Sequence, residues 1–344
     1  MRTPRQDDLG LLRIVNETGF SISRLPNGAI FAMEHGRIMI NQSLASPIAG
    51  GMGRLCLRTG GHDPMILPIV GPEAGRRIGA AHDRFVWQGE TSGVRHQVGL
   101  WLHPGMNLWL WRLEVINGRR GTLPCDAVFI QDLGLGEQSF LMSNEAYACQ
   151  YLDHYIARHP RMDCVLMSRQ NLSQDGAHPW IAHGCVEGAA GFATDFRQLM
   201  GPAYRDADQL DCSFGTSLPS NRLQYETACA ALQSKATALA PGATATWTFF
   251  GRYVPDHPAA STDADLALIS DVERVSKEWT PHRVALSGPT RSFLQDAPSV
   301  VADPLDQATI KARYPRRTHV ERADGQILWD CPKFCVRGRL TITL

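Results

Sequence analysis

Residues 84–131 read RFVWQGETSGVRHQVGLWLHPGMNLWLWRLEVINGRRGTLPCDAVFIQ. Apolar and polar side chains alternate along this stretch, a period of two that is typical of strands buried on one face. A His-Pro-Gly turn at 103–105 separates two of the predicted strands, and the Asn-Gly pair at 117–118 is a hairpin signal between the next two. Strands at this spacing, with no helical period between them, predict an antiparallel β-sandwich.

Further strands are predicted on both sides of this stretch. Residues 20–23 and 30–40 alternate around an Asn-Gly turn and indicate a β-meander. Residues 180–194 hold two more alternating strands. Residues 225–239 and 244–253 are interpreted as a closing strand pair around an Ala-Pro-Gly turn. The predicted fold class is mainly β, a large antiparallel β-sandwich followed by a helical linker.

Two segments of the sequence carry a helical period. Residues 142–157 favour a helix or a compact functional loop, because apolar side chains recur there at helix-like spacing. Thr262 to Asp265 fits a capping box, and apolar residues then recur every three positions in a helix that ends near Trp279. We therefore expect a β-sandwich domain at 1–254, a linker helix at 255–280, and an extended strap with an atypical tail at 281–344.

The charge balance, the cysteines and the hydropathy of the sequence limit the expected partners and cellular compartment. The chain has 344 residues, and 34 basic residues balance 34 acidic ones, so a formal net charge of +0 gives no electrostatic reason to expect nucleic acid or an anionic membrane. Nine cysteines, mostly isolated in apolar or mixed segments, favour free thiols in a reducing compartment over a disulfide framework. The N-terminus lacks the apolar run of a signal peptide, and no apolar stretch reaches membrane-spanning length. The sequence predicts a soluble, cytoplasmic protein.

The candidate functional residues lie between positions 129 and 184, where amides, carboxylates, imidazoles and aromatic rings are concentrated. A pyranose offers hydroxyls to such donors and acceptors and C–H faces to rings, so a carbohydrate-facing surface is one interpretation. The alternative is one long ordered loop held by side-chain hydrogen bonds. Arg169 suits either a bound carboxylate or phosphate, or an internal partner such as Asp153. The candidates for carbohydrate or domain-interface contacts are Asn144, Glu145, Tyr147, Gln150, Asp153, His154, Arg169, Gln170, Asn171, His178 and Trp180.

The sequence lacks a self-sufficient active-site motif. It contains no nucleophile elbow, zincin helix or P-loop. The spacing of the clustered histidines matches no metal-ligand pattern, and a hydrogen-bonding or structural role is the default for His154, His159, His178 and His183. We therefore predict no metal site and assign no catalytic residue.

Several short motifs, taken together, resemble a known family. They are NGAIFA at 27–32, QDLGL at 131–135, NEAY at 144–147, QYLDH at 150–154, RQN at 169–171, HPW at 178–180 and FFGRY at 249–253. In combination they resemble the N-terminal β-sandwich region of the 1,2-β-oligoglucan phosphorylases of glycoside hydrolase family 94, to which the cellobiose phosphorylases also belong. The resemblance extends from about Gly19 to Leu328.

This resemblance implies a galactose-mutarotase-like supersandwich followed by a helical linker and, in whole family members, an (α/α)6 barrel. It implies reversible, inverting phosphorolysis of β-1,2-glucosidic bonds, with inorganic phosphate as co-substrate, no other cofactor and glucose 1-phosphate as product. Because the family's general-acid aspartate and phosphate site lie in the barrel, no catalytic residue is carried over to this chain. The implied partners are β-1,2-glucooligosaccharides and a separately encoded or missing barrel domain.

Three functions remain open at this point. The first is a non-catalytic, carbohydrate-binding or barrel-supporting N-terminal domain of a β-1,2-glucan phosphorylase. The second is a free-standing sugar mutarotase or epimerase that uses a histidine and a carboxylate of the candidate region for proton transfer. The third is a truncated gene product without independent activity, because residues 329–339 depart from the family pattern. Whether the isolated chain is an enzyme therefore stays open.

Overall fold

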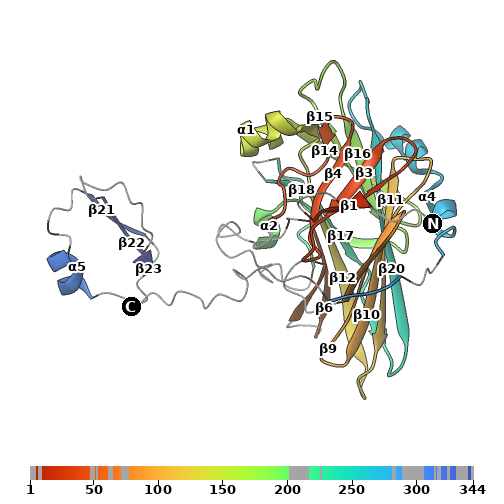
Figure 1. Ribbon diagram of the computed structural model, residues 1–344, viewed down its shortest axis with the longest axis horizontal. Coiled ribbons are helices and arrows are strands. Elements are labelled where there is room, and N and C mark those ends of the chain that lie inside the picture. The colour runs from red at the N-terminus through yellow and green to blue at the C-terminus, as the bar shows by residue number, and fades with distance from the viewer. Residues whose placement is uncertain are drawn as a thin grey trace. The chain divides into compact units, whose positions relative to one another are not determined.

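The structure is a computed structural model of the chain. It describes residues 5–6, 10–46, 51, 53–60, 65–70, 77–200, 217–224, 227–280, 284–288, 306–313, 315, 319–323, 326–330 and 340–341. The chain divides into two units, Met1–Gln295 and Asp296–Leu344. The first unit is built from three sheets, which Figure 1 shows with their strand labels.

The large sheet has eight strands, and every neighbouring pair is antiparallel. In spatial order its strands are β14 (Leu152–His159), β15 (Asp163–Gln170), β16 (Trp180–Cys185), β20 (Thr244–Val254), β11 (Leu108–Asn117), β10 (Val94–Leu102), β9 (Arg84–Thr91) and β8 (Arg77–Ala81).

A second sheet, here called the opposite sheet, packs against the large one. Its strands in spatial order are β17 (Ala189–Asp195), β18 (Ala228–Ser234), β12 (Leu123–Asp132), β6 (Arg54–Thr59) and β7 (Met65–Val70), with β19 (Thr237–Leu239) also paired to β12. The N-terminal sheet contains β1 (Arg5–Gln6), β2 (Leu12–Val15), β3 (Phe20–Arg24), β4 (Ile30–His35), β5 (Ile38–Met39) and β13 (Gly136–Glu137). The predicted antiparallel sandwich and the opening β-meander are both confirmed.

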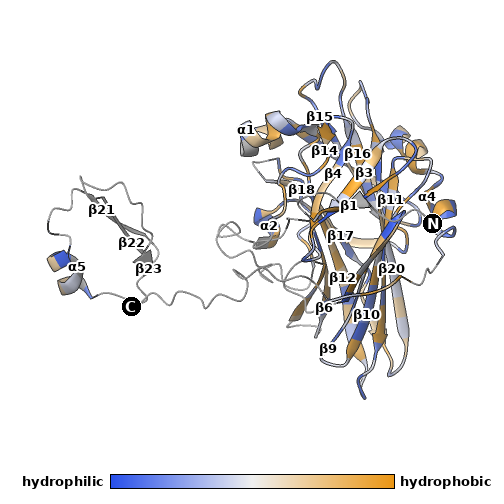
Figure 2. Cartoon of the chain, viewed as in Figure 1, coloured by the Kyte–Doolittle hydropathy of each residue, from blue (hydrophilic) through white to orange (hydrophobic). Residues whose placement is uncertain are grey.

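The main core lies between these sheets and follows from the alternation along the strands. Val98 and Leu100 of β10 are buried in one cluster with Leu57 of the opposite sheet and Ile22 of the N-terminal sheet. Trp101, the residue after Leu100, is buried on the other face of the large sheet. In Figure 2, hydrophobic (orange) and hydrophilic (blue) residues both occur along the strands, as this alternation requires. Each large apolar side chain that is fully buried in this way contributes about 1.5–3 kcal/mol.

Glycines inside the large sheet give aromatic rings room to lie on the backbone. Trp109 of β11 lies directly opposite Gly251 of β20, and a Cβ atom at position 251 would come within 2.2 Å of the Trp109 ring. Phe250 stands opposite Gly184 of β16 in the same manner, with 2.4 Å between its ring and a Cβ at position 184. Side chains are therefore excluded at these two positions by packing rather than by backbone angles.

Two predicted strand pairings are wrong. The Asn-Gly pair at 117–118 does not close a hairpin, because β11 belongs to the large sheet and β12 to the opposite sheet. The same holds for residues 225–239 and 244–253, since β18 pairs with β17 and β12 whereas β20 pairs with β16 and β11. Both connections run from one sheet to the other. The Asn117 side chain links them, because its Nδ2 donates 2.8 Å hydrogen bonds to the Gly121 carbonyl in the first connection and to the Leu239 carbonyl at the start of the second.

The helices among the described residues of the first unit are few and short. Helix α1 (Gln138–Cys149) precedes β14, so the helix predicted over 142–157 is wrong beyond Cys149, where the chain turns and becomes a strand. Helix α2 (Arg197–Met200) follows β17. The predicted linker helix is two pieces, the 3-10 helix η2 (Asp263–Ile269) and α4 (Val272–Ser276), and the capping box of Thr262 and Asp265 at its start is confirmed.

Residues 255–280 and 284–288, here called the crossing segment, cover the outer face of the large sheet. Ile269 and Val272 are buried with Trp101 and Leu110 of that face. The ring of Trp279 lies on Gly99, where a Cβ atom would come within 2.2 Å of it. Its other contacts are an edge-on ring contact with Trp101 and the Arg84 guanidinium, 5.1 Å from its ring centroid. Arg84 Nη1 also donates a 2.6 Å hydrogen bond to the Thr280 carbonyl.

The crossing segment reaches the last strand of the large sheet. Ser287 and Ile78 of β8 exchange two backbone hydrogen bonds, of 2.7 and 2.9 Å. The second unit is described separately and contains α5 (Gln307–Arg313), β21 (His319–Ala323), β22 (Gln326–Asp330) and β23 (Leu340–Thr341), with the three strands forming one antiparallel sheet. Residues 331–339, most of the tail that departs from the family pattern, lie outside the described residues.

Candidate functional site

The candidate residues gather at one end of the sandwich. They lie on α1, on the turn after it, at the start of β14, at the end of β15 and at the start of β16. Because these three strands are antiparallel neighbours, the start of β14, the end of β15 and the start of β16 meet at the same edge of the large sheet. Figure 1 shows α1 beside this end. The stretch that is continuous in sequence is therefore also continuous in space.

Four of the candidates are buried, namely His154, Arg169, Gln170 and Trp180, and the contacts of the three other than Arg169 serve the fold. Trp180 is fully buried and donates a 2.9 Å hydrogen bond from its indole nitrogen to Ser261 of the crossing segment. Gln170 donates to the Gly134 carbonyl at 3.2 Å and accepts from the Leu172 amide at 3.0 Å. His154 is buried and its Nδ1 lies 2.8 Å from the Ser168 hydroxyl. None of the three side chains has a face open to a ligand in this conformation.

Arg169 holds the start of the crossing segment. Its Nε donates to the His257 carbonyl at 2.6 Å, its Nη2 to the Pro258 carbonyl at 2.9 Å, and its Nη1 to the Asn171 side-chain oxygen. Asp153, the internal partner predicted for Arg169, receives none of these hydrogen bonds. Asp153 instead lies 3.6 Å from the Arg222 guanidinium.

His178 completes this attachment. Its backbone amide donates a 2.9 Å hydrogen bond to Asp256, and its carbonyl accepts one of 2.9 Å from the His257 amide. The His257 ring is stacked on Trp180, with 5.4 Å between centroids, and its Nε2 lies 2.9 Å from Asp265. Arg169, His178 and Trp180 thus fix the direction in which the chain leaves the sandwich.

The exposed candidates form a separate patch. Tyr147, 52% exposed, meets Tyr151 ring edge to ring face with 5.2 Å between centroids, and their hydroxyls are hydrogen-bonded. Gln150 is exposed, and its carbonyl accepts a 3.0 Å hydrogen bond from the Gln224 side chain. Asn171 is exposed, and its backbone amide donates to the Tyr151 carbonyl at 2.9 Å.

Asn144 and Glu145 belong to the same helix. Asn144 is exposed, and its side-chain nitrogen donates a 2.9 Å hydrogen bond to the Phe140 carbonyl one turn earlier. The side chain of Glu145 lies outside the described residues. Two members of the exposed patch, Tyr151 and Gln224, were missing from the sequence-based set. The spacing of four residues between Tyr147 and Tyr151 was the available signal for the first, because such pairs are neighbours on a helix. Gln224 had no signal, since it is distant in sequence.

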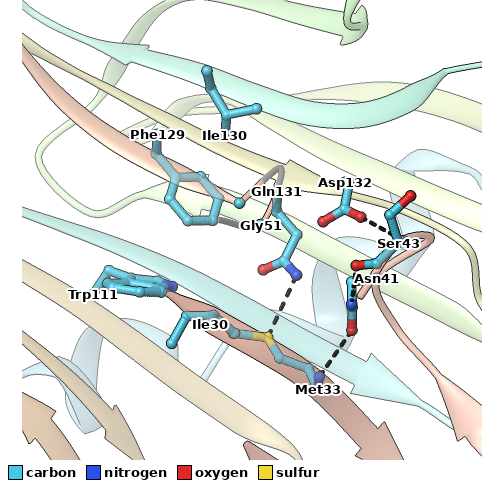
Figure 3. A pocket seen from close by; sticks show the side chains of 11 residues that line it. Ile30, Met33, Asn41, Ser43, Gly51, Trp111, Phe129, Ile130, Gln131 and Asp132 are labelled. Carbon is cyan, nitrogen blue, oxygen red and sulfur yellow. Dashed lines mark hydrogen bonds between the residues drawn. The ribbon is translucent and has the colours of Figure 1, made fainter. Parts of the chain in front are cut away.

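A small cavity lies deeper in the first unit, between the N-terminal sheet and the other two (Figure 3). Trp111, Phe129, Met33 and Gln131 are among its walls, and the Gln131 amide donates to the Met33 sulfur at 3.4 Å. The space open to the centre of a water molecule is about 10 Å³. That volume suits about one water molecule, whereas small-molecule sites typically measure roughly 300–1,000 Å³. The cavity is therefore too small for a pyranose.

Asp132 lies at the edge of this cavity and accepts hydrogen bonds from the backbone amides of Gln42, at 2.9 Å, and Ser43, at 3.0 Å. Burial raises its pKa to about 6, although the two amides and Arg54 act in the opposite direction. Its contribution to stability is therefore fully present below about pH 4 and is lost as the pH rises through about 6.

Two histidines of the candidate region are buried in the neutral form. Burial, with a smaller effect of Arg222, lowers the pKa of His154 to about 4. Burial lowers the pKa of His183 to about 3, and neither of its ring nitrogens has a hydrogen-bond partner among the described residues. Its ring is packed between Trp109 and Phe129. Both imidazoles are therefore poorly placed to exchange protons with a bound sugar.

Replacement of His183 by leucine should make the fold less sensitive to acid. The unfolded imidazole takes up a proton near pH 6.5 and the folded one only near pH 3, so its contribution to stability is complete above about pH 6.5 and is lost as the pH falls. By pH 4.5 the loss is about 2–3 kcal/mol. The difference in free energy of unfolding between pH 7.5 and 4.5, measured by urea denaturation, should be smaller by that amount in His183→Leu. An equal difference in both proteins would mean that folded His183 accepts a proton.

The structure also bears on metals, thiols and membranes. Within the described ranges, no three His, Cys, Asp or Glu side chains are grouped so that they could hold a metal ion. The six cysteines that the structure describes are free thiols, as predicted: Cys56, Cys125, Cys149, Cys164, Cys185 and Cys229. Cys331 and Cys335 lie outside the described part. Of the helices that the structure describes, none combines the length and the hydropathy needed to span a bilayer.

Comparison with known proteins identifies relatives of this chain. The model of a protein family described as the SOGP N-terminal domain matches residues 23–251. A curated relative, the 1,2-beta-oligoglucan phosphorylase of Listeria innocua serovar 6a, is 25% identical over 321 residues. The alignment covers 92% of this chain and 28% of the relative, so the chain spans just over a quarter of that protein's length.

Solved structures also match this chain, at low sequence identity. A bacterial glucoamylase complexed with acarbose superposes with a TM-score of 0.46 and 9% identity, covering 80% of this chain and 37% of the glucoamylase. A galactose mutarotase related enzyme from Lactobacillus acidophilus gives a TM-score of 0.37 and 10% identity, covering 73% of this chain and 100% of that enzyme.

Proposed function

Because this chain belongs to the SOGP N-terminal domain family, we propose that it serves as the non-catalytic N-terminal module of a β-1,2-glucan phosphorylase. The observation that carries the proposal is the extent of the match. The family covers residues 23–251, whereas the chain spans 28% of a relative named 1,2-beta-oligoglucan phosphorylase. In this proposal the module binds β-1,2-glucooligosaccharides and supports a catalytic barrel domain that is separately encoded or missing from this chain.

The site supports binding more than catalysis. Its exposed groups are aromatic rings and amides, which suit the C–H faces and hydroxyls of a sugar. Its two buried histidines are neutral and enclosed, as described above. Arg169 and His178 attach the crossing segment, which gives the module a fixed exit direction suited to a supporting role.

Isothermal titration of the purified chain with β-1,2-glucooligosaccharides should give weak binding, with a Kd of roughly millimolar order because the surface is shallow. The same sample, supplied with inorganic phosphate, should release no glucose 1-phosphate and should not accelerate glucose mutarotation. β-1,3-linked oligosaccharides of equal length are the matched ligand control and should bind more weakly.

Each alternative result has a defined meaning. Release of glucose 1-phosphate by the isolated chain would overturn the assignment as non-catalytic. Accelerated mutarotation would favour a mutarotase instead. Absence of binding at ten millimolar oligosaccharide, on the order of ten times the expected Kd, would remove the carbohydrate-binding part of the proposal.

A further inference from the structure

We propose that Tyr147 and Tyr151 form the sugar-stacking subsite of this module. The inference rests on the proposed function and assigns its glucan-binding surface to one place, the outer side of α1 and the turn that follows it. The ligand class is a neutral β-linked glucooligosaccharide, held by ring stacking and by amide hydrogen bonds rather than by ion pairs.

The geometry of the tyrosine pair is the first argument. The two ring planes meet at 80° with centroids 5.2 Å apart, so one ring presents a face beside the edge of the other. Tyr147 is 52% exposed, so its ring is accessible to a ligand. The hydrogen bond between the two hydroxyls holds the rings in this arrangement before any ligand arrives. A prearranged aromatic surface loses little conformational entropy on binding.

The polar groups around the rings are the second argument. Gln150, Asn171 and Gln224 border the tyrosines, and backbone and side-chain hydrogen bonds connect all of them into one surface. The Gln224 amide nitrogen and the Asn171 side-chain oxygen are both engaged with the protein, which orients these amides. Amides oriented in this way can place the remaining donor and acceptor atoms toward sugar hydroxyls.

The charge balance is the third argument. Asp153, two residues after Tyr151, lies 3.6 Å from the Arg222 guanidinium, so these two opposite charges balance each other. Arg169 is occupied by carbonyl and amide oxygens. A surface of rings and amides with internally balanced charges suits an uncharged glucan better than a phosphate or a carboxylate.

Other exposed large apolar residues lack these features. Met142, 62% exposed, lies on α1 and has no ring on which a sugar could stack. Val15 and Met65 are exposed on strands of other sheets. Met142 therefore provides a control on the same helix, and Val15 provides one on a distant strand.

The test is titration of four variants with β-1,2-glucooligosaccharides. Tyr147→Ala and Tyr151→Ala should each raise Kd about tenfold or more. Each variant loses the stacking contact with the sugar and the apolar area that this contact buries, and a tenfold change in Kd corresponds to about 1.4 kcal/mol. Tyr147→Phe keeps the ring but loses the hydroxyl that holds the pair in place, so it should raise Kd by about threefold, less than Tyr147→Ala does. Met142→Ala should bind as wild type does. Equal affinity in wild type and both alanine variants would overturn the subsite.

A second test uses the unmutated chain, so its result does not depend on whether the variants fold. Tetranitromethane should nitrate Tyr147 in the free chain, and saturating β-1,2-glucooligosaccharide should reduce that nitration several-fold, as read by peptide mass spectrometry. Tyr155, which is partly exposed on β14 and hydrogen-bonded to Asp263, provides the control and should be nitrated equally with and without glucan. If the wild type binds the glucan but the nitration of Tyr147 does not change, the subsite alone is overturned. If the wild type does not bind the glucan at all, the binding part of the proposed function is overturned as well.

Discussion

Substitution of Gly251 by valine is expected to lower the free energy of unfolding by about 4–5 kcal/mol, the largest effect of any change considered in this chain. The Cβ atom alone would lie 2.2 Å from Trp109 Cζ2 and 2.3 Å from Cε2. Trp109 is fully buried between Phe20 and His183, so its ring has no free space to move into. Overpacking of a closed core forces rotamer and backbone shifts.

Gly121 provides the control for this prediction. No atom lies within 4 Å of a Cβ built at that position, so Gly121→Val adds the same two methyl groups without a clash. We expect urea midpoints within the equivalent of about 1 kcal/mol of wild type for Gly121→Val. Gly251→Val should yield little folded protein. A normal urea transition for Gly251→Val would show that the Trp109 ring can be displaced at low cost.

Loss of the Asp126 carboxylate is expected to cost about 3–5 kcal/mol. Arg58 Nε and Nη2 donate to the two oxygens of Asp126 at 2.8 and 2.7 Å, and the two side chains are only 3% and 10% exposed. Gln233 adds a 3.3 Å hydrogen bond to the same carboxylate. Asp126→Ala therefore leaves a buried guanidinium without its counter-charge, and the thermal midpoint should fall accordingly.

Two comparisons separate the buried charge from other causes. The double variant Arg58→Met with Asp126→Leu removes both charges at similar volume, and should recover most of the lost stability. Glu34→Ala removes the carboxylate of an exposed pair, in which Arg13 Nη2 lies 3.2 Å from Glu34, and should change stability by less than about 1 kcal/mol. A double variant as unstable as Asp126→Ala would point to lost packing instead of an unpaired charge.

The strands could be predicted because their information is local. Alternation along β10 and β11 specifies which side chains enter the core, and the structure places Val98 and Leu100 on one side and Trp101 on the other. The capping box at Thr262 is similarly local, since its two partners are three residues apart. Each of these features is decided by neighbours along the chain.

Strand partners could not be predicted in the same way. A turn such as Asn117-Gly118 permits a hairpin, but it equally permits a connection between two layers. Here β11 and β12 bury their apolar faces against each other across the core, so they are stacked rather than hydrogen-bonded side by side. That choice depends on where the other strands lie, which no short window of sequence contains.

The candidate site shows the same division. The mixture of residue types between positions 129 and 184 correctly indicated a concentration of polar contacts, but exposure of each side chain depends on its strand register and on the crossing segment. Trp180 is covered by His257, which is far along the chain, whereas Tyr147 remains open. The pairing of Arg169 with Asp153 was wrong, because Arg169 donates to the backbone carbonyls of His257 and Pro258, which are far along the chain.

The contact between Ser287 and Ile78 has a consequence for self-association. The last strand of an open sheet presents unpaired amide and carbonyl groups, and a second chain can add its own strand there. The crossing segment pairs with both the backbone amide and the carbonyl of Ile78. It also lies close to the next residue, Gly79, where a Cβ atom would be 2.6 Å from the Ala285 carbonyl. The same residues that attach the crossing segment to the large sheet thus make β8 a poor template for fibrils or domain-swapped dimers.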